Sequence, residues 1–146
     1  MSIDPIRRRA LVILLFGACV SIPLAGCDSG VRRVPVSGAV TLDGLPLDRG
    51  VLLFHPDESR GNTARVSCTG PVSGGRYKLV TSGVTKSDTG EGAPLGWYKV
   101  TLLADMPGMA EIKVHSKFLS PDTSPLAVEI VENPDAGKYD LQLTTK

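Results

Sequence analysis

The chain has 146 residues, with 16 basic and 15 acidic side chains and a formal net charge of +1. Nucleic-acid binding proteins carry a clustered basic face, which this sequence does not suggest. The 16 glycines and 11 prolines fall between apolar runs without a collagen-like period, which is typical of turns in an all-β protein.

The first 26 residues have the composition of a secretory leader. Three arginines at residues 7–9 precede eleven apolar or small residues at 10–20. A membrane-spanning helix needs about 20 such residues, so this run is too short to span and matches the helical core of a signal peptide. We therefore predict that residues 1–26 are removed. The remaining chain has 13 basic and 14 acidic residues.

The end of this leader carries the most specific motif in the chain. Leu24-Ala25-Gly26-Cys27 resembles the lipobox of bacterial lipoproteins, in which the cysteine is acylated and becomes the first residue. The resemblance implies cleavage between Gly26 and Cys27, palmitate or a related acyl chain on Cys27, and a protein anchored to a membrane of the bacterial cell envelope, on its periplasmic or outward face. Two or three acyl chains give a stable anchor. The alternative is a plain secreted protein in which Cys27 is a free thiol.

Residues 27–33 are expected to form a lipidated tether. Asp28 resembles a signal that keeps some bacterial lipoproteins in the inner membrane, or it is a polar linker residue, so the choice of membrane stays open. The six residues 28–33 that follow Cys27 span at most about 20 Å, which places the domain close to the bilayer. Arg32 and Arg33 either lean on anionic headgroups, at about 1 kcal/mol each, or are solvated linker charges.

The cysteines predict a domain without an internal disulfide. Cys19 leaves with the leader and Cys27 is expected to be modified, so only Cys68 remains. Cys68 lies on the apolar side of an alternating segment, which predicts a buried thiol that acts as a small hydrophobic residue. A reactive or intermolecularly bridged thiol is the alternative.

Residues 34–146 are expected to be one domain built from strands. Hydrophobic alternation with a period of two predicts seven strands, at 34–42, 51–56, 64–68, 76–81, 96–104, 126–132 and 138–143. Two antiparallel sheets packed face to face are the natural way to bury seven one-sided strands, so a β-sandwich is predicted. The expected inward side chains include Val40, Leu52, Phe54, Tyr77, Leu79, Tyr98, Val100, Leu102, Val128, Ile130, Tyr139, Leu141 and Leu143.

Two connections stand out. Asp43-Gly44 is a tight-turn signal after the first strand. The connection 105–125 is long for a segment without structure, so a short strand or turn is expected near residues 112–114. Ile112, Val114 and Phe118 are expected to plug the core.

Several segments together resemble a known family. They are residues 36–47, 50–56, 74–79, 96–101 and 117–126. They are similar to carboxypeptidase regulatory-like domains with a transthyretin-like sandwich, and the last segment resembles one found in small bacterial lipoproteins of this type. The chain departs from the pattern at Gly74, where Asp is usual, and at Trp97. The shared positions are turn glycines and core aromatics, so the resemblance implies a fold and an accessory role of unassigned function.

No catalytic or metal-binding constellation emerges from the sequence. Transthyretin-fold hydroxyisourate hydrolases use a His/Arg cluster and a characteristic C-terminal tetrapeptide, whereas this chain ends Gln142-Leu143-Thr144-Thr145-Lys146. His55 and His115 are interpreted as surface imidazoles and lack metal-ligand spacing. No Gly-x-Ser-x-Gly turn occurs. No catalytic residue, metal or cofactor is therefore expected.

Trp97 is the candidate binding residue, because it is predicted on the face of its strand that points away from the core. An exposed aromatic anchors a partner or a sugar ring. Alternatively, the connection 105–125 folds over it. The expected function is a non-catalytic structural or protein-interaction module, with the membrane through the Cys27 lipid and an envelope protein or glycan as partners, and no nucleic acid. A ligand- or carbohydrate-binding lipoprotein using Trp97 and the end loops is the alternative, and a hydroxyisourate-hydrolase-like enzyme is the least favoured.

Overall fold

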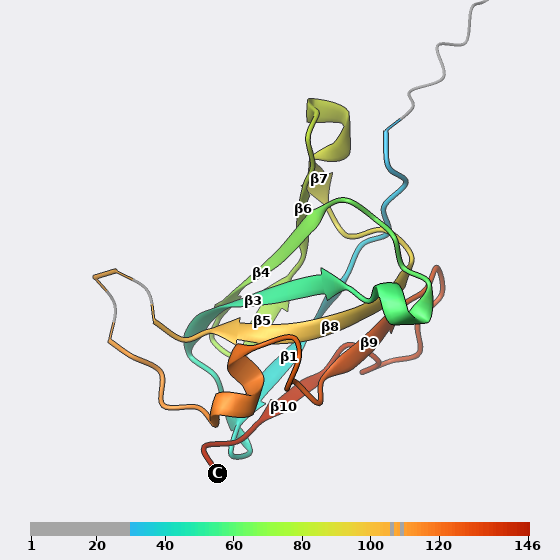
Figure 1. Cartoon of the computed structure of the whole chain (residues 1–146). Helices are drawn as coiled ribbons and strands as arrows, with labels where there is room; N and C mark the ends of the chain where they lie inside the picture. Colours follow the sequence, from blue (N-terminus) through green and yellow to red (C-terminus); the bar gives the residue numbers. More distant parts are fainter. Residues whose placement is uncertain (1–29, 106, 109) are drawn as a thin grey trace, which may run out of the picture.

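The computed structural model describes residues 30–105, 107–108 and 110–146 (Figure 1). The predicted signal peptide, its expected helix, the cleavage site at Gly26 and the lipidation site Cys27 lie outside these residues. Among the helices of the described part, none has the length and apolar character needed to cross a membrane.

The described residues form an all-β structure, as predicted. Their strands are β1 (Ser37–Leu42), β2 (Leu45–Pro46), β3 (Arg49–Pro56), β4 (Ser67–Ser73), β5 (Arg76–Lys78), β6 (Val80–Ser82), β7 (Gly90–Glu91), β8 (Gly96–Leu103), β9 (Ala127–Ile130) and β10 (Leu141–Leu143). Three short 3-10 helices lie between them: η1 (Glu58–Arg60), η2 (Lys86–Asp88) and η3 (Ser116–Leu119).

The strands follow the order β10-β1-β5-β4-β3-β8-β9, with β2 beside β1, and β6 between β4 and β7. The sheet curls into a half-barrel (Figure 1). Neighbouring strands are antiparallel except β1 and β10, which pair in parallel through Val40–Leu141 and Leu42–Leu143.

This arrangement differs from the expected seven antiparallel strands. The segment 76–81 is divided at Leu79, whose N–H donates to the carbonyl of Val36 while its own carbonyl accepts from Gly92. The two halves become β5 and β6, which pair with different parts of β4. The two-residue strands β2 and β7 lie in segments that were expected to be turn or loop.

The predicted alternation is confirmed by burial. One contiguous core contains the inward side chains expected from the sequence, among them Val40, Leu52, Phe54, Tyr77, Tyr98, Val100, Val128, Tyr139 and Leu141. Cys68 is also buried, at 2% exposed, as predicted. Thr101 lies on the same side of β8 as Trp97, which the alternation predicts to face outward, but Thr101 is only 3% exposed, and its hydroxyl lies 2.9 Å from Nε2 of His55 on the adjacent strand. The pattern of one strand does not reveal a polar partner supplied by the next.

The Asp43-Gly44 turn has the geometry its sequence predicts. Both residues have positive φ, 50° and 82°, as the common two-residue hairpin turn requires, and Leu42 pairs with Leu45 across it. Gly74 and Gly75, with φ of 56° and 76°, make the equivalent turn between β4 and β5. Gly74 therefore suits a left-handed turn position, where glycine has no side-chain penalty.

The connection 105–125 contains η3, and its described residues form no strand near 112–114. Phe118 is buried within η3, and the partly buried Ile112 and Val114 pack against the core. The three expected plugs are therefore confirmed, although the regular element that carries Phe118 is a 3-10 helix.

Candidate functional site

Trp97 lies at the start of β8, beside the point where β3 ends. β3 and β8 pair as far as Pro56–Tyr98, and the N–H of Asp57 then donates to the carbonyl of Trp97 over 2.9 Å. The side-chain amide of Asn62 donates to the same carbonyl over 2.8 Å. These bonds hold the backbone of Trp97 against the turn that contains η1.

The indole of Trp97 is half-buried beneath the guanidinium of Arg60. The central carbon of that guanidinium lies 4.4 Å from the ring centroid, within the range of a cation–π interaction. Arg60 Nε is 3.6 Å from Oδ2 of Asp57, whose Oδ1 accepts from the N–H and hydroxyl of Ser59 over 3.1 and 2.5 Å. The Ser59 hydrogen bonds, followed by the positive charges of Lys99 and Arg60, lower the pKa of Asp57. An ionised carboxylate therefore holds the cation over the ring.

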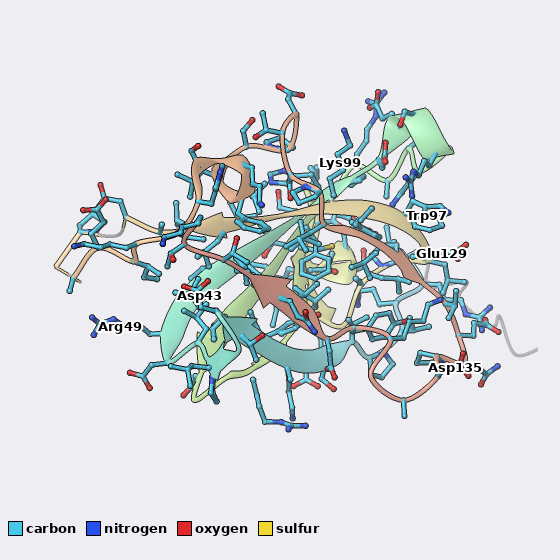
Figure 2. The ribbon with its side chains drawn as sticks, turned by 90° about the horizontal axis from the view of Figure 1, so that it is seen from below. Asp43, Arg49, Trp97, Lys99, Glu129 and Asp135 are labelled. Atoms are coloured by element: carbon cyan, nitrogen blue, oxygen red, sulfur yellow. The ribbon has the colours of Figure 1, made fainter. Side chains whose placement is uncertain are left out.

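The side chain over Trp97 thus comes from η1. The η3 helix of the connection 105–125 lies toward the other end of β8 (Figure 1). Trp97 pairs across strands with Glu129, and both side chains lie near the η1 end of the molecule with Lys99 further along β8 (Figure 2). We define Arg60, Trp97, Lys99 and Glu129 as the Trp97 face. It combines a partly exposed aromatic ring with charges of both signs.

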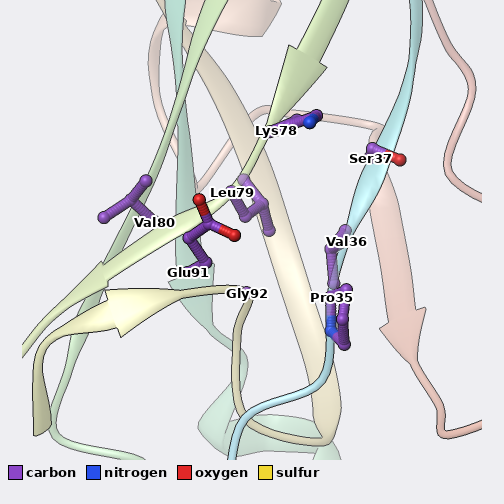
Figure 3. A pocket seen from close by; sticks show the side chains of 8 residues that line it. All are labelled: Pro35, Val36, Ser37, Lys78, Leu79, Val80, Glu91 and Gly92. Carbon is purple, nitrogen blue, oxygen red and sulfur yellow. The ribbon is translucent and has the colours of Figure 1, made fainter.

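Apart from the Trp97 face, a concave surface lies where the sheet divides at Leu79 (Figure 3). It is lined by Pro35, Val36, Ser37, Lys78, Leu79, Val80, Glu91 and Gly92 and has a volume of about 230 Å³. Ligand pockets usually measure about 300–1,000 Å³. A neighbouring, more open hollow of about 540 Å³ shares Ser37, Lys78, Val80 and Glu91. Sequence reasoning missed this groove, because the division of the strand at Leu79 that creates it is a tertiary feature.

The two histidines have separate structural partners. His55 is half-buried on β3 next to Thr101, and burial lowers the pKa of its imidazole. His115 precedes η3 and its Nδ1 accepts from the N–H of Lys117 over 3.1 Å. In the described part of the chain neither imidazole is hydrogen-bonded to an arginine, and no three His, Cys, Asp or Glu side chains gather in a way that could hold a metal ion.

The described end of the expected tether contacts the domain. The N–H of Val31 donates to Oδ1 of Asp88 over 3.4 Å, and Arg33 donates to the carbonyl of Ser87 over 2.9 Å. Arg32 forms an ion pair with Glu132. The sequence offered no signal for these contacts, because their partners lie more than fifty residues away.

Comparisons with protein-family models, with curated proteins and with solved structures find no match to this chain.

Proposed function

We propose that this protein is a lipid-anchored β-sandwich domain of the bacterial cell envelope that acts as a non-catalytic structural or protein-interaction module. The observation that carries the proposal is Leu24-Ala25-Gly26-Cys27, which directly follows a basic and apolar leader and precedes a domain with its own core. Acylation of Cys27 would hold that domain at a membrane surface.

The curled sheet supports a sandwich of the transthyretin-like kind. The strands at the two ends of its main path, β9 and β10, are consecutive in the sequence, and the N–H of Val131, just after β9, donates to the hydroxyl of Tyr139, just before β10, over 3.1 Å. Both strands contribute buried side chains to the one core. The repeated turn glycines and core aromatics of the carboxypeptidase regulatory-like resemblance agree with this proposal.

The use of polar groups supports a non-catalytic role. His55, His115 and Asp57 are each engaged with a neighbouring hydroxyl or backbone group. Catalysis would need a nucleophile or base aimed at a substrate position. A hydroxyisourate-hydrolase-like activity is accordingly the least favoured proposal.

The anchor is tested by Cys27→Ala in the full-length chain, expressed in a bacterium that receives an alkyne-bearing fatty acid. The wild-type protein should incorporate the label and sediment with membranes, whereas the variant should do neither. Cys19→Ala is the matched control, since it removes a thiol from the leader and should leave labelling and sedimentation unchanged. Equal labelling of the Cys27 variant and the wild type would rule out the anchor.

The partly exposed Trp97 favours a second candidate, binding of an envelope glycan or other ligand on the Trp97 face. Trp97 is the only tryptophan of the chain, so its fluorescence reports directly on this face. Titration with soluble cell-wall oligosaccharides should leave the emission unchanged if the domain is a structural module. A saturable change that Glu129→Gln weakens would favour the binding function.

A further inference from the structure

The chain enters the domain along the loop that carries η2. We define the η2 tip as residues 83–89. Beyond the contacts of Val31 with Asp88 and of Arg33 with Ser87, the backbone of Gly30 lies directly against this tip, because a Cβ added at Gly30 would be 2.8 Å from the carbonyl oxygen of Ser87. Val34 and Ala93 then exchange two backbone hydrogen bonds of 3.0 Å. The path of residues 30–34 is therefore defined by the domain.

The η2 tip is ordered by its own hydrogen bonds. Thr85 and Asp88 form a capping box, in which Oδ2 of Asp88 accepts from the hydroxyl and the N–H of Thr85 over 2.7 and 3.3 Å. The tip thus presents a defined surface, which projects from the same end of the molecule as the entering chain (Figure 1).

The exposed side chains of the η2 tip are Val84 and Lys86, together with the hydroxyl-bearing Thr85, Ser87 and Thr89. Val84 is 93% exposed, more than the other large hydrophobic side chains that the described domain leaves at its surface. Lys86 is exposed on the same turn. Glu58 and Arg65 line a hollow next to Val84 and offset each other in charge, while Asp88 is occupied by Thr85 and Val31. An apolar side chain next to a lysine suits the boundary between acyl chains and headgroups.

We propose that the η2 tip is a membrane-contact site, which places Val84 in the interfacial region of the bilayer and Lys86 among its headgroups. The inference rests on the proposed acylation of Cys27. Only Asp28 and Ser29 separate Cys27 from Gly30, so the three intervening residue steps span at most about 11 Å. Since the backbone of Gly30 contacts Ser87, the η2 tip stays close to Cys27. The end of the domain that carries η2 should therefore be the end that faces the membrane.

A pair of fluorescent variants tests this contact. Val84→Cys, carrying an environment-sensitive nitrobenzoxadiazole label, is purified in its acylated form and incorporated into vesicles of phosphatidylethanolamine and phosphatidylglycerol that contain brominated lipid. Leu45→Cys is the matched control, since Leu45 is also a highly exposed apolar residue, at 71%, and begins β2 at the opposite end of the molecule (Figure 1). Cys68 is buried and does not compete for the label.

The label at residue 84 should show blue-shifted emission and quenching by the brominated lipid, and the label at residue 45 neither. If both proteins float with the vesicles and neither label is quenched, the contact is wrong although the anchor stands. If the acylated protein does not associate with vesicles at all, the anchor is wrong, and the contact with it. Equal quenching at both positions would also overturn the contact. So would an emission shift at residue 84 that appears only after envelope proteins are added, and that result would indicate a protein partner.

The contacts of residues 31 and 33 with the η2 tip are tested separately, by combining Arg33→Ala with Asp88→Asn in the labelled Val84→Cys protein. Flotation should be unchanged, because the lipid is intact, while quenching should fall toward the value at residue 45. Full quenching in this variant would contradict the proposed role of the seated chain in orienting the tip.

Discussion

The phenol of Tyr77 donates a hydrogen bond to the backbone carbonyl of Tyr139 over 2.6 Å. Tyr77 belongs to β5 and Tyr139 precedes β10, and β1 lies between these two strands. The ring therefore reaches past β1 at Gly38, which is its direct cross-strand partner. One side chain thus fastens three strands whose residues are far apart in the sequence.

Tyr77→Phe should lower the free energy of unfolding by about 1–3 kcal/mol, because a buried carbonyl loses its donor while the ring still fills the core. Urea denaturation of the wild type and the variant measures this difference. An unchanged midpoint with an unchanged slope would show that the bond adds nothing to stability.

Because this phenol is buried, we expect the protein to lose stability at high pH. Burial, followed by the negative charge of Asp140, raises the pKa of Tyr77, and burial also raises the pKa of Tyr98. A raised pKa in the folded state means that the full stability is present below the unfolded value of about 10 and falls as the pH rises above it. Each tyrosine should contribute a loss of about 1.4 kcal/mol per pH unit. Denaturation curves below and above pH 10 give the slope of the free energy of unfolding against pH. In Tyr77→Phe this slope should be smaller by about 1.4 kcal/mol per pH unit. Equal slopes in the wild type and the variant would contradict a buried, protonated Tyr77.

Gly38→Ala should be strongly destabilising, because β1 passes too close to its neighbours for a side chain. An added Cβ would lie 2.2 Å from the carbonyl oxygen of Tyr139 and 3.1 Å from Cε1 of Tyr77. The strand would have to shift, at a cost of about 1–3 kcal/mol or more. Gly44→Ala is the comparison, since it has a positive φ but nothing within 4 Å of the added carbon. In thermal unfolding, the melting temperature of Gly38→Ala should be lower than that of Gly44→Ala. The reverse order would argue that β1 can move away from Tyr139 and Tyr77.

Much of the fold could be predicted because burial alternates along most of the strands, with Thr101 of β8 as an exception. Val40, Phe54, Tyr98 and Val128 all lie inside, as the period of two requires. The parallel pairing of β1 with β10 could not be predicted, because local alternation gives the buried face of a strand and not its neighbour. The Trp97 face was predicted in part. That Trp97 and Lys99 lie on the side of β8 away from the core follows from the pattern, whereas Arg60 comes from a polar loop 37 residues earlier.

Cys68→Ser should destabilise the domain by about 1–3 kcal/mol, because it replaces an apolar thiol by a hydroxyl in the core. Cys68 Sγ lies 3.4 Å from the hydroxyl of Thr81, which already donates to the carbonyl of Gly92 over 2.6 Å. Burial also raises the pKa of the Cys68 thiol, so it should react with thiol reagents only on unfolding. Cys68→Ala is the control that keeps the site apolar and should lose less stability than the serine variant. A wild-type melting temperature for Cys68→Ser would contradict the importance of apolarity at this site.

Arg60→Ala should expose the indole of Trp97 to water and shift the emission of this single tryptophan to longer wavelength. Arg60 is 47% exposed, so its interaction with the ring should contribute only about 0.5–1 kcal/mol. The free energy of unfolding should therefore change little, although the emission shifts.

Arg60→Lys tests the geometry of the contact, because it retains the charge and loses the planar group that stacks on the ring. Arg65→Ala is the control for removing a positive charge nearby. If the emission is unchanged in Arg60→Ala, other groups cover the ring and the Trp97 face is closed. If the emission shifts in Arg60→Ala and much less in Arg60→Lys, the cation is a removable cover, and a ligand that displaces it would gain access to the ring.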